Sequence, residues 1–454
     1  MATTSIRALQ DFQTTPFPEL EKQMKRGERA EDLRLLYGDE LAAEMQQMVA
    51  SEEVRVLSGA ARPLIILLPG IMGSTLRNIR GEIGLIWLNP IALVQGRLRL
   101  VRLAPDGTTN AEPTEIIASG LIPKPYFPLY LHLRWSGCDV LSFPYDWRRA
   151  PSVTAEVLAA FVRQQRIKDN RPIHLVCHSM GGLVARHYCR LYPDEASSAL
   201  AQIVLLGTPN YGSVDAVQNL TIGSKAISLL TRLNAANDPL GIVRSAPGVY
   251  SLLPAPRVSY PTGHDVPPYP FTEEFNCYDV GTYQVEGVSA DHLGTAQNDY
   301  MLLANTSLPV PMTAIAGSNL PTAAGVIKVQ PADDRVMFDF ETHLSLDGDG
   351  TVLTASVVAL PGAARYYVKN GRHLNLPEYP GVRRAVEALV HGDEPDLPTS
   401  PDKVLSAQDL ADIAGVPEAP LPGTISEAEL EVIAERIRRD MATPEDLTLL
   451  SHML

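Results

Sequence analysis

Short apolar runs recur through the middle of the chain, and most of them end in glycine or proline. They read RPLIILLPG from residue 62, DVLSFP from 139, PIHLVC from 172, AQIVLLG from 201 and MTAIAG from 312. Runs of this length between turn residues are typical of strands that are buried on both faces. Helical patterns separate several of them, for example at residues 152–167 and 180–192. Strands that alternate with helices predict an α/β fold, with a mostly parallel sheet flanked by helices.

Two long segments interrupt this alternation. Residues 71–138 contain Trp87, Trp135 and a weakly patterned region, and residues 208–311 carry many Pro, Asn, Tyr and Gly residues without a clear strand period. Insertions of this length usually carry function or cover a site. We interpret both segments as excursions from the sheet, and the second as a cap or lid insertion at about 208–311.

The N-terminal end has a helical pattern. Across residues 17–53, apolar side chains recur at spacings of three and four and form one stripe, made of Leu33, Leu36, Tyr37, Leu41, Met45 and Met48. We therefore expect residues 1–60 to be a helical extension of an α/β domain that spans residues 61–391.

The C-terminal end, residues 392–454, is predicted to be an acidic linker followed by a helical extension. The linker GDEPDLPTSPDK is rich in Pro and Asp, and TISEAELEVIAERIRRDM follows from residue 424. Thr424 and Glu427 fit a capping box at the start of a helix. Its predicted apolar face consists of Leu430, Ile433, Ala434, Ile437 and Met441. Thr443, Pro444 and Asp446 predict the start of a second short helix.

The charge is concentrated at the two ends of the chain. The net charge of the 454 residues is −14, yet residues 61–391 hold 27 acidic and 27 basic residues, whereas residues 392–454 hold 14 acidic and 4 basic ones. A nucleic acid partner is not expected, because no basic stripe could neutralise a phosphate backbone. Attraction to an anionic membrane surface is not expected either.

The first residues contain no apolar segment of signal-peptide length, and no window reaches the roughly 20 apolar residues of a transmembrane helix. We therefore expect a cytoplasmic protein. Its four cysteines include no C-x-x-C pair, so a zinc site is not expected, and reduced thiols fit that compartment.

The segment HLVCHSMGGLVARHYC at residues 174–189 carries the strongest chemical signal. An apolar run ends at Ser179, and two glycines and a helical pattern follow. A strand, x-x-Ser-x-Gly and a helix form the pattern of a nucleophile elbow, in which the residues two before and two after the serine must be small. Gly181 meets this demand, and Cys177 stands where glycine is usual. The pattern predicts Ser179 as a nucleophile and the N–H of Met180 as an oxyanion donor, with an ordinary Ser-Met-Gly-Gly turn as the alternative.

LLPGIMGS at residues 67–74 follows the first predicted strand. In hydrolases with a nucleophile elbow, the corresponding loop gives the second oxyanion donor. Because Pro-Gly fixes the turn, we expect the N–H of Ile71 to point inward. An ordinary glycine-rich turn is the alternative here.

DGDGTVL at residues 347–353 and VKNGRHLNLP at 368–377 offer an acid and a base. Ser179, Asp349 and His373 then follow the order Ser, Asp, His of the α/β-hydrolase topology. Asp349 lies between two glycines, where the backbone can turn its side chain toward the base, whereas Asp347 is expected to cap the turn by accepting backbone N–H groups. Asp347 and Asp349 also alternate as in a calcium loop, but Thr351 and Val352 depart from the EF-hand pattern.

Together these residues resemble the lecithin:cholesterol acyltransferase family, which includes lysosomal phospholipase A2 and plant phospholipid:diacylglycerol acyltransferases. The matching segments lie within residues 63–377: ILLPGIMGS, FPYDWRR, HSMGG, GTPNYGS, SAPGVYSLLPAP, DGDGTV and HLNLP. The resemblance implies an α/β-hydrolase fold with Ser179 as nucleophile, His373 as base, Asp349 as its partner, and oxyanion donors at Ile71 and Met180. It also implies a structural turn at Tyr145, Asp146 and Trp147. Secreted members close their lid with a disulfide, whereas this chain has no cysteine between Ile71 and Trp135.

The predicted function is a serine-dependent acyl-ester hydrolase or acyltransferase that forms an acyl-enzyme and needs no metal or organic cofactor. The expected substrate is a lipid or another apolar acyl ester, because residues 220–253 are rich in Leu, Ile and Val that either line an acyl pocket or pack the cap onto the body. Transfer to an alcohol stays open beside hydrolysis. Two other hypotheses are a regulated or scaffolded protein whose acidic C-terminal helices dock a protein partner, and a catalytically silent binder.

Overall fold

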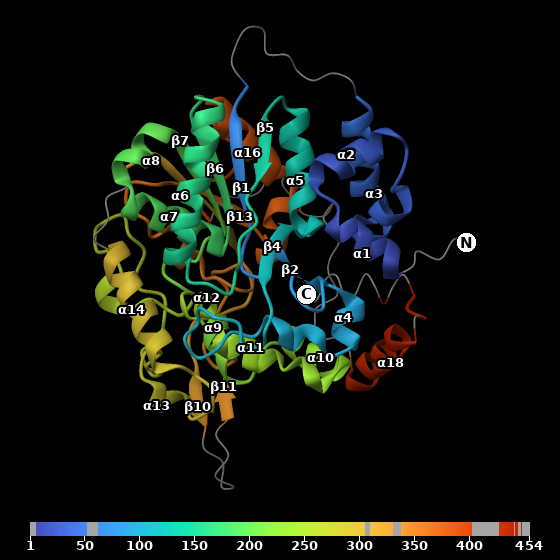
Figure 1. The fold of residues 1–454 in the computed structure, drawn as a ribbon. Helices are drawn as coiled ribbons and strands as arrows, with labels where there is room; N and C mark the ends of the chain where they lie inside the picture. Colours follow the sequence, from blue (N-terminus) through green and yellow to red (C-terminus); the bar gives the residue numbers. More distant parts are fainter. Residues whose placement is uncertain are drawn as a thin grey trace.

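The computed structural model describes residues 6–51, 62–304, 309–329, 337–401, 426–439, 441–443 and residue 446. Six parallel strands form its central sheet, in the order β13-β8-β7-β6-β1-β5 (Figure 1). Their bounds are β1 Leu64–Leu68, β5 Asp139–Ser142, β6 Ile173–His178, β7 Leu200–Leu206, β8 Met312–Ser318 and β13 Ala364–Lys369. Every apolar run that predicted a strand is a strand of this sheet, and all residues of β1 and β8 are buried, as expected for strands covered on both faces.

Helices cover the two faces of the sheet (Figure 1). On one face, α6 Pro151–Lys168 packs against α7 Met180–Leu191. On the other, α5 Pro123–Trp135 packs against α16 Pro380–His391. This order of parallel strands between two helical layers is the α/β-hydrolase fold, so the predicted fold class is confirmed.

The weakly patterned region after β1 contains a second sheet that the sequence did not predict. Its three antiparallel strands are β2 Ser74–Asn78, β3 Gly84–Trp87 and β4 Ile116–Leu121, in the order β3-β2-β4. Helix α4 Pro90–Val94 and the 3-10 turn η1 Arg97–Val101 connect β3 to β4. The strands were missed because each has only four to six residues, and β2 and β4 pair across a long connection.

The elements of the segment expected to be the cap are all helices in its described part, and irregular stretches such as residues 260–279 separate them. Its elements are α9 Asp215–Thr221, α10 Lys225–Leu233, η2 Ala235–Asn237, α11 Pro239–Ser245, α12 Pro247–Tyr250, η3 Arg257–Ser259, α13 Val280–Tyr283 and α14 Ala290–Ala304. Many of them share an apolar cluster with side chains such as Val217, Tyr250 and Leu253. Short antiparallel pairs follow β8: β9 Thr322–Ala323 with β12 Leu344–Ser345, and β10 Ile327–Val329 with β11 Met337–Asp339.

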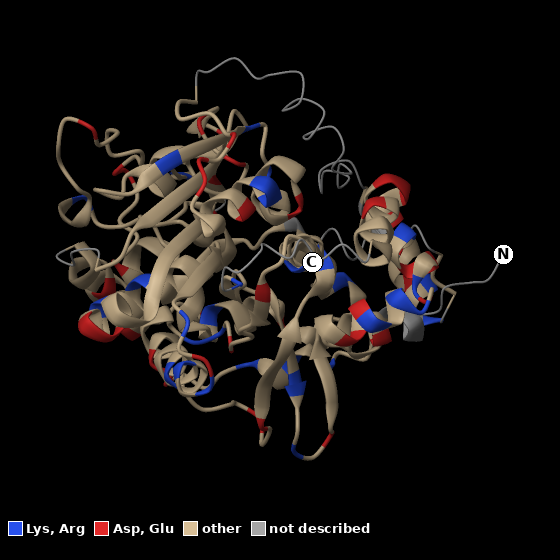
Figure 2. Ribbon diagram, turned by 90° about the horizontal axis from the view of Figure 1, so that it is seen from above, with Lys and Arg blue, Asp and Glu red and all other residues tan. Residues whose placement is uncertain are grey.

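Three helices precede the sheet, where one long helical stretch was predicted. They are α1 Ile6–Thr14, α2 Phe17–Lys25 and α3 Ala30–Ala50. The predicted stretch breaks at Gly27, whose φ of 78° ends α2 in a turn, and α3 kinks at Gly38. The predicted apolar stripe from Leu33 to Met45 is buried, and α3 packs on α5 (Figure 1). Figure 2 shows acidic and basic residues interspersed on these helices.

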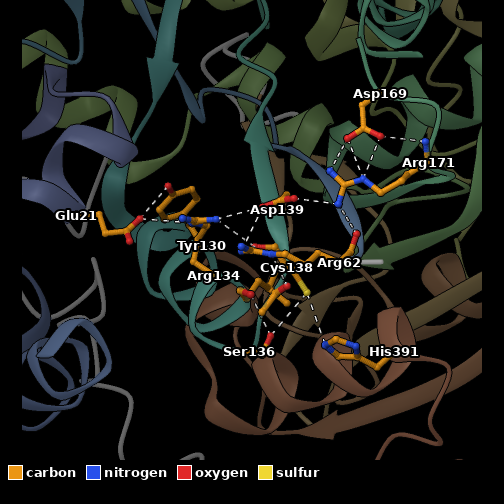
Figure 3. Close-up of polar contacts among 12 residues, drawn as sticks. Glu21, Arg62, Tyr130, Arg134, Ser136, Cys138, Asp139, Asp169, Arg171 and His391 are labelled. Atoms are coloured by element: carbon orange, nitrogen blue, oxygen red, sulfur yellow. Dashed lines mark hydrogen bonds and ion pairs between the residues drawn. The ribbon is translucent and has the colours of Figure 1, made fainter. Parts of the chain in front are cut away.

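A polar network ties the N-terminal helices to the start of β5 (Figure 3). The carboxylate of Asp139 lies 3.2 Å from Arg62, 3.5 Å from Arg134 and 2.9 Å from Arg171. Arg134 also lies 3.5 Å from Glu21 of α2. Because Asp139 begins its strand and Ser179 follows the end of β6, the network lies at the opposite edge of the parallel sheet from the serine. We assign it a structural role.

Helix α18, Glu427–Arg438, begins two residues later than the sequence suggested. The predicted capping box of Thr424 and Glu427 is wrong: the Ser426 hydroxyl accepts the N–H of Glu429, and the Glu429 carboxylate accepts the N–H of Ser426. Thr424 lies outside the described residues. Ser426 and Glu429 have the same Ser/Thr-x-x-Glu spacing as Thr424 and Glu427, two positions further along the chain. The spacing alone therefore does not decide at which of the two positions the helix begins. Thr443 and Asp446 cap each other reciprocally, but the helix predicted to follow them lies outside the described residues.

The apolar face of α18 packs on the molecule itself. Ile433, Ala434 and Ile437 are buried, and α18 contacts α4 and α10 (Figure 1). Met441, which was predicted to share this face, is exposed, and the side chain of Leu430 lies outside the described part. The covered side chains Ile433, Ala434 and Ile437 are therefore not a free docking face for a partner.

Removing this helix should lower stability without abolishing catalysis. A chain that ends at Pro401 keeps Pro398, whose carbonyl accepts the N–H of Tyr367 in β13, but it exposes the apolar surface of α4 and α10. We expect a lower melting temperature, and a kcat for a soluble short-chain ester within a few-fold of the full-length value. Calorimetry and ester kinetics check this, and full-length Met441→Ala serves as the control. An inactive but folded shortened chain would show that α18 contributes to the site.

Candidate active site

Ser179 occupies the corner between β6 and α7. Its backbone has φ 50° and ψ −124°, and its N–H donates to the carbonyl of Leu206 in the neighbouring strand β7 at 2.9 Å. A residue other than glycine rarely adopts a positive φ, and such strain clusters at functional sites. The corner predicted from the sequence is therefore present, with the serine 5% exposed.

The glycine after this corner is required by close packing. A Cβ atom at Gly181 would lie 2.6 Å from the carbonyl oxygen of Pro69, which is backbone and cannot move aside easily. Cys177, on the other side of the serine, is fully buried in β6. The close approach of the Pro69 carbonyl therefore explains why glycine is needed at residue 181. At residue 177, two positions before the serine, the side chain of cysteine is small enough to fit.

Ser179, His373 and Asp349 form one chain of hydrogen bonds. The Oγ of Ser179 lies 2.9 Å from Nε2 of His373, and Nδ1 of His373 lies 2.8 Å from Oδ2 of Asp349. All three side chains are buried. His373 begins the 3-10 turn η4 His373–Glu378 after β13, and Asp349 lies in the turn after β12. The structure thus brings together the three residues that the sequence singled out.

Asp349 and Asp347 have different surroundings. The Oδ1 of Asp349 accepts the backbone N–H groups of Thr351 at 3.0 Å and Val352 at 2.7 Å. Asp347 is exposed, and within the described residues only its main chain forms hydrogen bonds: its N–H donates to the Ser345 hydroxyl, and its carbonyl accepts the N–H of Thr354. The expectation that Asp347 caps the turn is therefore wrong. Asp349 does so with one oxygen and binds the histidine with the other, because its side chain points inward.

The environment of His373 favours its charged form. Burial alone lowers the pKa of His373, but the Asp349 carboxylate beside it outweighs this, and the net effect raises the pKa above its usual value. Asp215, at the start of α9, contributes in the same direction. Burial raises the pKa of Asp215 itself, opposed by His373 and by the amide of Asn219. An imidazole with a raised pKa is a stronger base, which suits removal of a proton from Ser179.

Two backbone N–H groups are available beside the serine. Among the described residues, neither the N–H of Ile71 nor that of Met180 has a hydrogen-bond acceptor. Met180 is the first residue of α7, where the helix dipole favours negative charge. Gly70, next to Ile71, lies so close that a Cβ atom there would be 2.9 Å from the Cβ of Ser179. Both predicted oxyanion donors thus flank the serine.

The turn at Tyr145, Asp146 and Trp147 supports the site from outside, as expected of a structural turn. The Asp146 carboxylate accepts from Nε of Arg148 at 2.8 Å and from Nε of Arg149 at 3.2 Å. Burial raises the pKa of Asp146, but these arginines outweigh it and lower the pKa overall. The Tyr145 hydroxyl donates to the carbonyl of Pro69 at 2.8 Å, so the turn also holds the loop that carries Ile71.

Two residues of the site carried no assigned role in the sequence analysis. His178 precedes the serine, and its Nε2 lies 3.0 Å from the carbonyl of His373. Tyr126, in α5, lies 2.9 Å from Nδ1 of His178 and accepts the N–H of Gly70 at 2.7 Å. His178 could have been noticed as a polar residue that ends a buried strand. Tyr126 had no local signal, because its partners are more than 50 residues away.

The apolar side chains of residues 220–253 mostly pack within the fold. Ile222 is exposed, but nine Leu, Ile and Val side chains of this segment are buried: Leu220, Ile227, Leu229, Leu230, Leu233, Ile242, Val243, Val249 and Leu253. In contrast, Ile71, Met72 and Leu252 are half-buried and pack against the apolar cluster of the segment predicted to be a cap. An apolar surface therefore adjoins the loop after β1.

Within the described ranges, no group of three His, Cys, Asp or Glu side chains could hold a metal ion. No helix in the same part of the chain is long and apolar enough to cross a membrane. The four cysteines are free, and burial raises the pKa of Cys138 to about 11.

Several solved structures are similar to this chain. The Tle4-Tli4 complex matches with 16% identity and a TM-score of 0.47, over 73% of this chain and 98% of that chain. The mature form of Bacillus licheniformis lipase BlEst2 matches with 15% identity and a TM-score of 0.35, over 70% of this chain and 87% of the lipase chain. The structure of the gene lin2722 products from Listeria innocua matches with 14% identity and a TM-score of 0.31, over 75% of this chain and 100% of that chain. No curated protein sequence matches the chain.

A family model matches the sequence directly. Its description is lecithin:cholesterol acyltransferase, and it matches residues 136–273, which include the corner at Ser179 and part of the predicted cap. The match supports an α/β-hydrolase enzyme of the acyl-ester hydrolase or acyltransferase class. The resemblance of this chain to the lecithin:cholesterol acyltransferase family, expected from its motifs, is thereby confirmed.

Proposed function

We propose that this protein is a serine-dependent enzyme that cleaves an apolar acyl ester through an acyl-enzyme on Ser179. The observation that carries the proposal is the unbroken hydrogen-bond chain Ser179–His373–Asp349 at a strained strand-to-helix corner. A nucleophile in contact with a base, and a base oriented by an acid, is the arrangement that activates a serine hydroxyl.

The reaction follows from the geometry in two steps. As Oγ of Ser179 bonds to the ester carbonyl carbon, Nε2 of His373 accepts the hydroxyl proton, and the carbonyl oxygen becomes an oxyanion held by the N–H groups of Ile71 and Met180. His373 then gives the proton to the departing alkoxide, which leaves as an alcohol. Asp349 holds the imidazole in the productive tautomer and stabilises the imidazolium.

The acyl group leaves Ser179 by the reverse sequence. A water molecule or an alcohol gives a proton to His373 as its oxygen attacks the acyl carbon, and the proton returns to Oγ of Ser179. Water yields a carboxylic acid, and an alcohol yields a new ester. Both outcomes use the same residues, so the proposal covers hydrolysis and transfer.

The half-buried side chains of Ile71, Met72 and Leu252 support an apolar acyl chain as the substrate group. They adjoin the apolar cluster of the cap beside the loop after β1. Burial of each methylene of an acyl chain against such a surface contributes about 0.8 kcal/mol.

Mass spectrometry of the enzyme after incubation with p-nitrophenyl butyrate or p-nitrophenyl decanoate tests the proposal. We expect a mass increase equal to the acyl group, located on Ser179 and absent in Ser179→Ala. The decanoyl ester should give the higher kcat/KM, because its chain buries more apolar surface. Glycerol in the assay separates transfer from hydrolysis through the product formed. Ester turnover without modification of Ser179 would contradict the proposal.

A further inference from the structure

The peptide between Pro69 and Gly70 is held on both sides by tyrosine hydroxyls. The hydroxyl of Tyr145 donates to the carbonyl of Pro69 at 2.8 Å, and the N–H of Gly70 donates to the hydroxyl of Tyr126 at 2.7 Å. The carbonyl and the N–H of one planar peptide point in opposite directions. Two hydrogen bonds to them therefore fix how the peptide plane is rotated.

Further hydrogen bonds hold the residues that follow this peptide. The carbonyl of Gly70 accepts the N–H of Gly73 at 3.1 Å, and the indole N–H of Trp87 donates to the carbonyl of Met72 at 2.8 Å. The N–H of Ile71 belongs to the same peptide as the Gly70 carbonyl and points away from it. Its direction is set by two restraints together: the held Pro69–Gly70 peptide before it, and the hydrogen bond of the Gly70 carbonyl to the N–H of Gly73.

The hydrogen bonds at Tyr126 have a defined direction. The carbonyl of His373 can only accept, so Nε2 of His178 must carry the proton of their 3.0 Å contact. Burial, with a smaller contribution from His373, lowers the pKa of His178 to about 3, so this ring is neutral at pH 7. Its Nδ1 is then an acceptor for the Tyr126 O–H at 2.9 Å. A lone pair of the Tyr126 oxygen is thereby left for the N–H of Gly70.

We propose that Tyr126 and Tyr145 are positioning residues that clamp the Pro69–Gly70 peptide and thereby aim the N–H of Ile71 at the oxyanion. Both side chains are almost fully buried, and their hydroxyls bond to the Pro69–Gly70 peptide and, for Tyr126, also to His178. An oxyanion donor is effective only when its direction is fixed before the reaction begins. The inference rests on the proposed function and deepens it.

Phenylalanine at either position removes one hydroxyl and keeps the ring. Tyr126→Phe leaves the N–H of Gly70 without its acceptor, and Tyr145→Phe leaves the carbonyl of Pro69 without its donor. For each, we expect kcat with p-nitrophenyl butyrate to fall at least about tenfold, but less than the roughly 10²- to 10³-fold that follows loss of a donor itself. KM and the ascending limb of the pH profile should stay unchanged, because the pair of His373 and Asp349 is intact.

Tyr130→Phe is the matched control. Tyr130 also lies in α5 and is equally buried, but its hydroxyl donates to Glu21 at 3.2 Å, away from the serine. Its kcat should stay within about twofold of the wild type. Dividing each rate by the number of sites titrated with a fluorophosphonate gives kcat per active molecule, so unfolded protein does not count.

The outcomes separate the clamp from the proposed function. Wild-type kcat per titrated site in both Tyr126→Phe and Tyr145→Phe, with Ser179→Ala inactive, would overturn the clamp alone. An equal loss in Tyr130→Phe would also overturn it, because the effect would then be general to α5. Full activity in Ser179→Ala would overturn the proposed function, and the clamp with it. A selective fall of kcat in the two clamp variants would support the inference.

Discussion

Ser179→Ala is expected to lower kcat for p-nitrophenyl esters by several orders of magnitude while the protein keeps its fold. The substitution removes only Oγ, which lies 2.9 Å from Nε2 of His373. Alanine has the same Cβ as serine, so the strained φ of 50° at this corner costs both residues about the same. Loss of the nucleophile of a triad typically costs about as much as loss of all its members.

The measurement pairs steady-state kinetics with circular dichroism and a melting curve. Ser198→Ala is a suitable control, because the exposed Ser198 hydroxyl donates to the carbonyl of Glu195 within its own helix, α8 Pro193–Ala199. The control should keep full activity. A Ser179→Ala enzyme with more than about a tenth of the wild-type kcat would show that another group attacks the ester.

Asp349→Asn is expected to lower kcat by about 10⁴-fold with little change in structure. Oδ1 of Asp349 accepts the N–H groups of Thr351 and Val352, so in the variant the amide oxygen must take this position. The amide NH₂ is then directed at Nδ1 of His373, 2.8 Å away in the wild type. A donor there stabilises the tautomer that carries its proton on Nε2, which cannot accept a proton from Ser179.

Asp347→Asn is the matched control in the same turn. Its side chain is exposed and is not hydrogen-bonded within the described part of the chain. We expect wild-type kcat and a melting temperature that changes little, since surface substitutions usually stay within about 0.5 kcal/mol. Both variants are assayed at pH 8. A large loss in Asp347→Asn, with Asp349→Asn still active, would reverse the assignment of the acid.

Long-range contacts account for what the sequence did not predict. Tyr126 reaches Gly70 and His178 across more than 50 residues, and no motif around it indicates this role. The sheet of β2, β3 and β4 escaped notice because its strands are short and because β2 and β4 pair across a long connection. The break at Gly27 was missed because apolar periodicity shows which face of a helix is buried, but not where a glycine adopts a positive φ.

Features that depend on neighbours in the chain were correctly predicted. Five of the six strands of the central sheet, all except β13, are apolar runs bounded by turn residues, and the corner at Ser179 needs a strand, a small residue and a helix in direct succession. Ser179 and His373 follow two parallel strands, β6 and β13, whose carboxyl ends lie at one edge of the sheet. With Asp349 they keep the order Ser, Asp, His that the α/β-hydrolase topology requires.

The sequence by itself therefore determined the fold class and which three residues could meet. Only the tertiary structure decided how they are held: which oxygen of Asp349 binds the histidine, and that Tyr126 and Tyr145 hold the peptide before Ile71. It also decided that Ile433, Ala434 and Ile437 of α18 are covered by α4 and α10. The physical reason is that local patterns set backbone conformation and burial, whereas hydrogen-bond direction and packing partners depend on residues that only folding brings together.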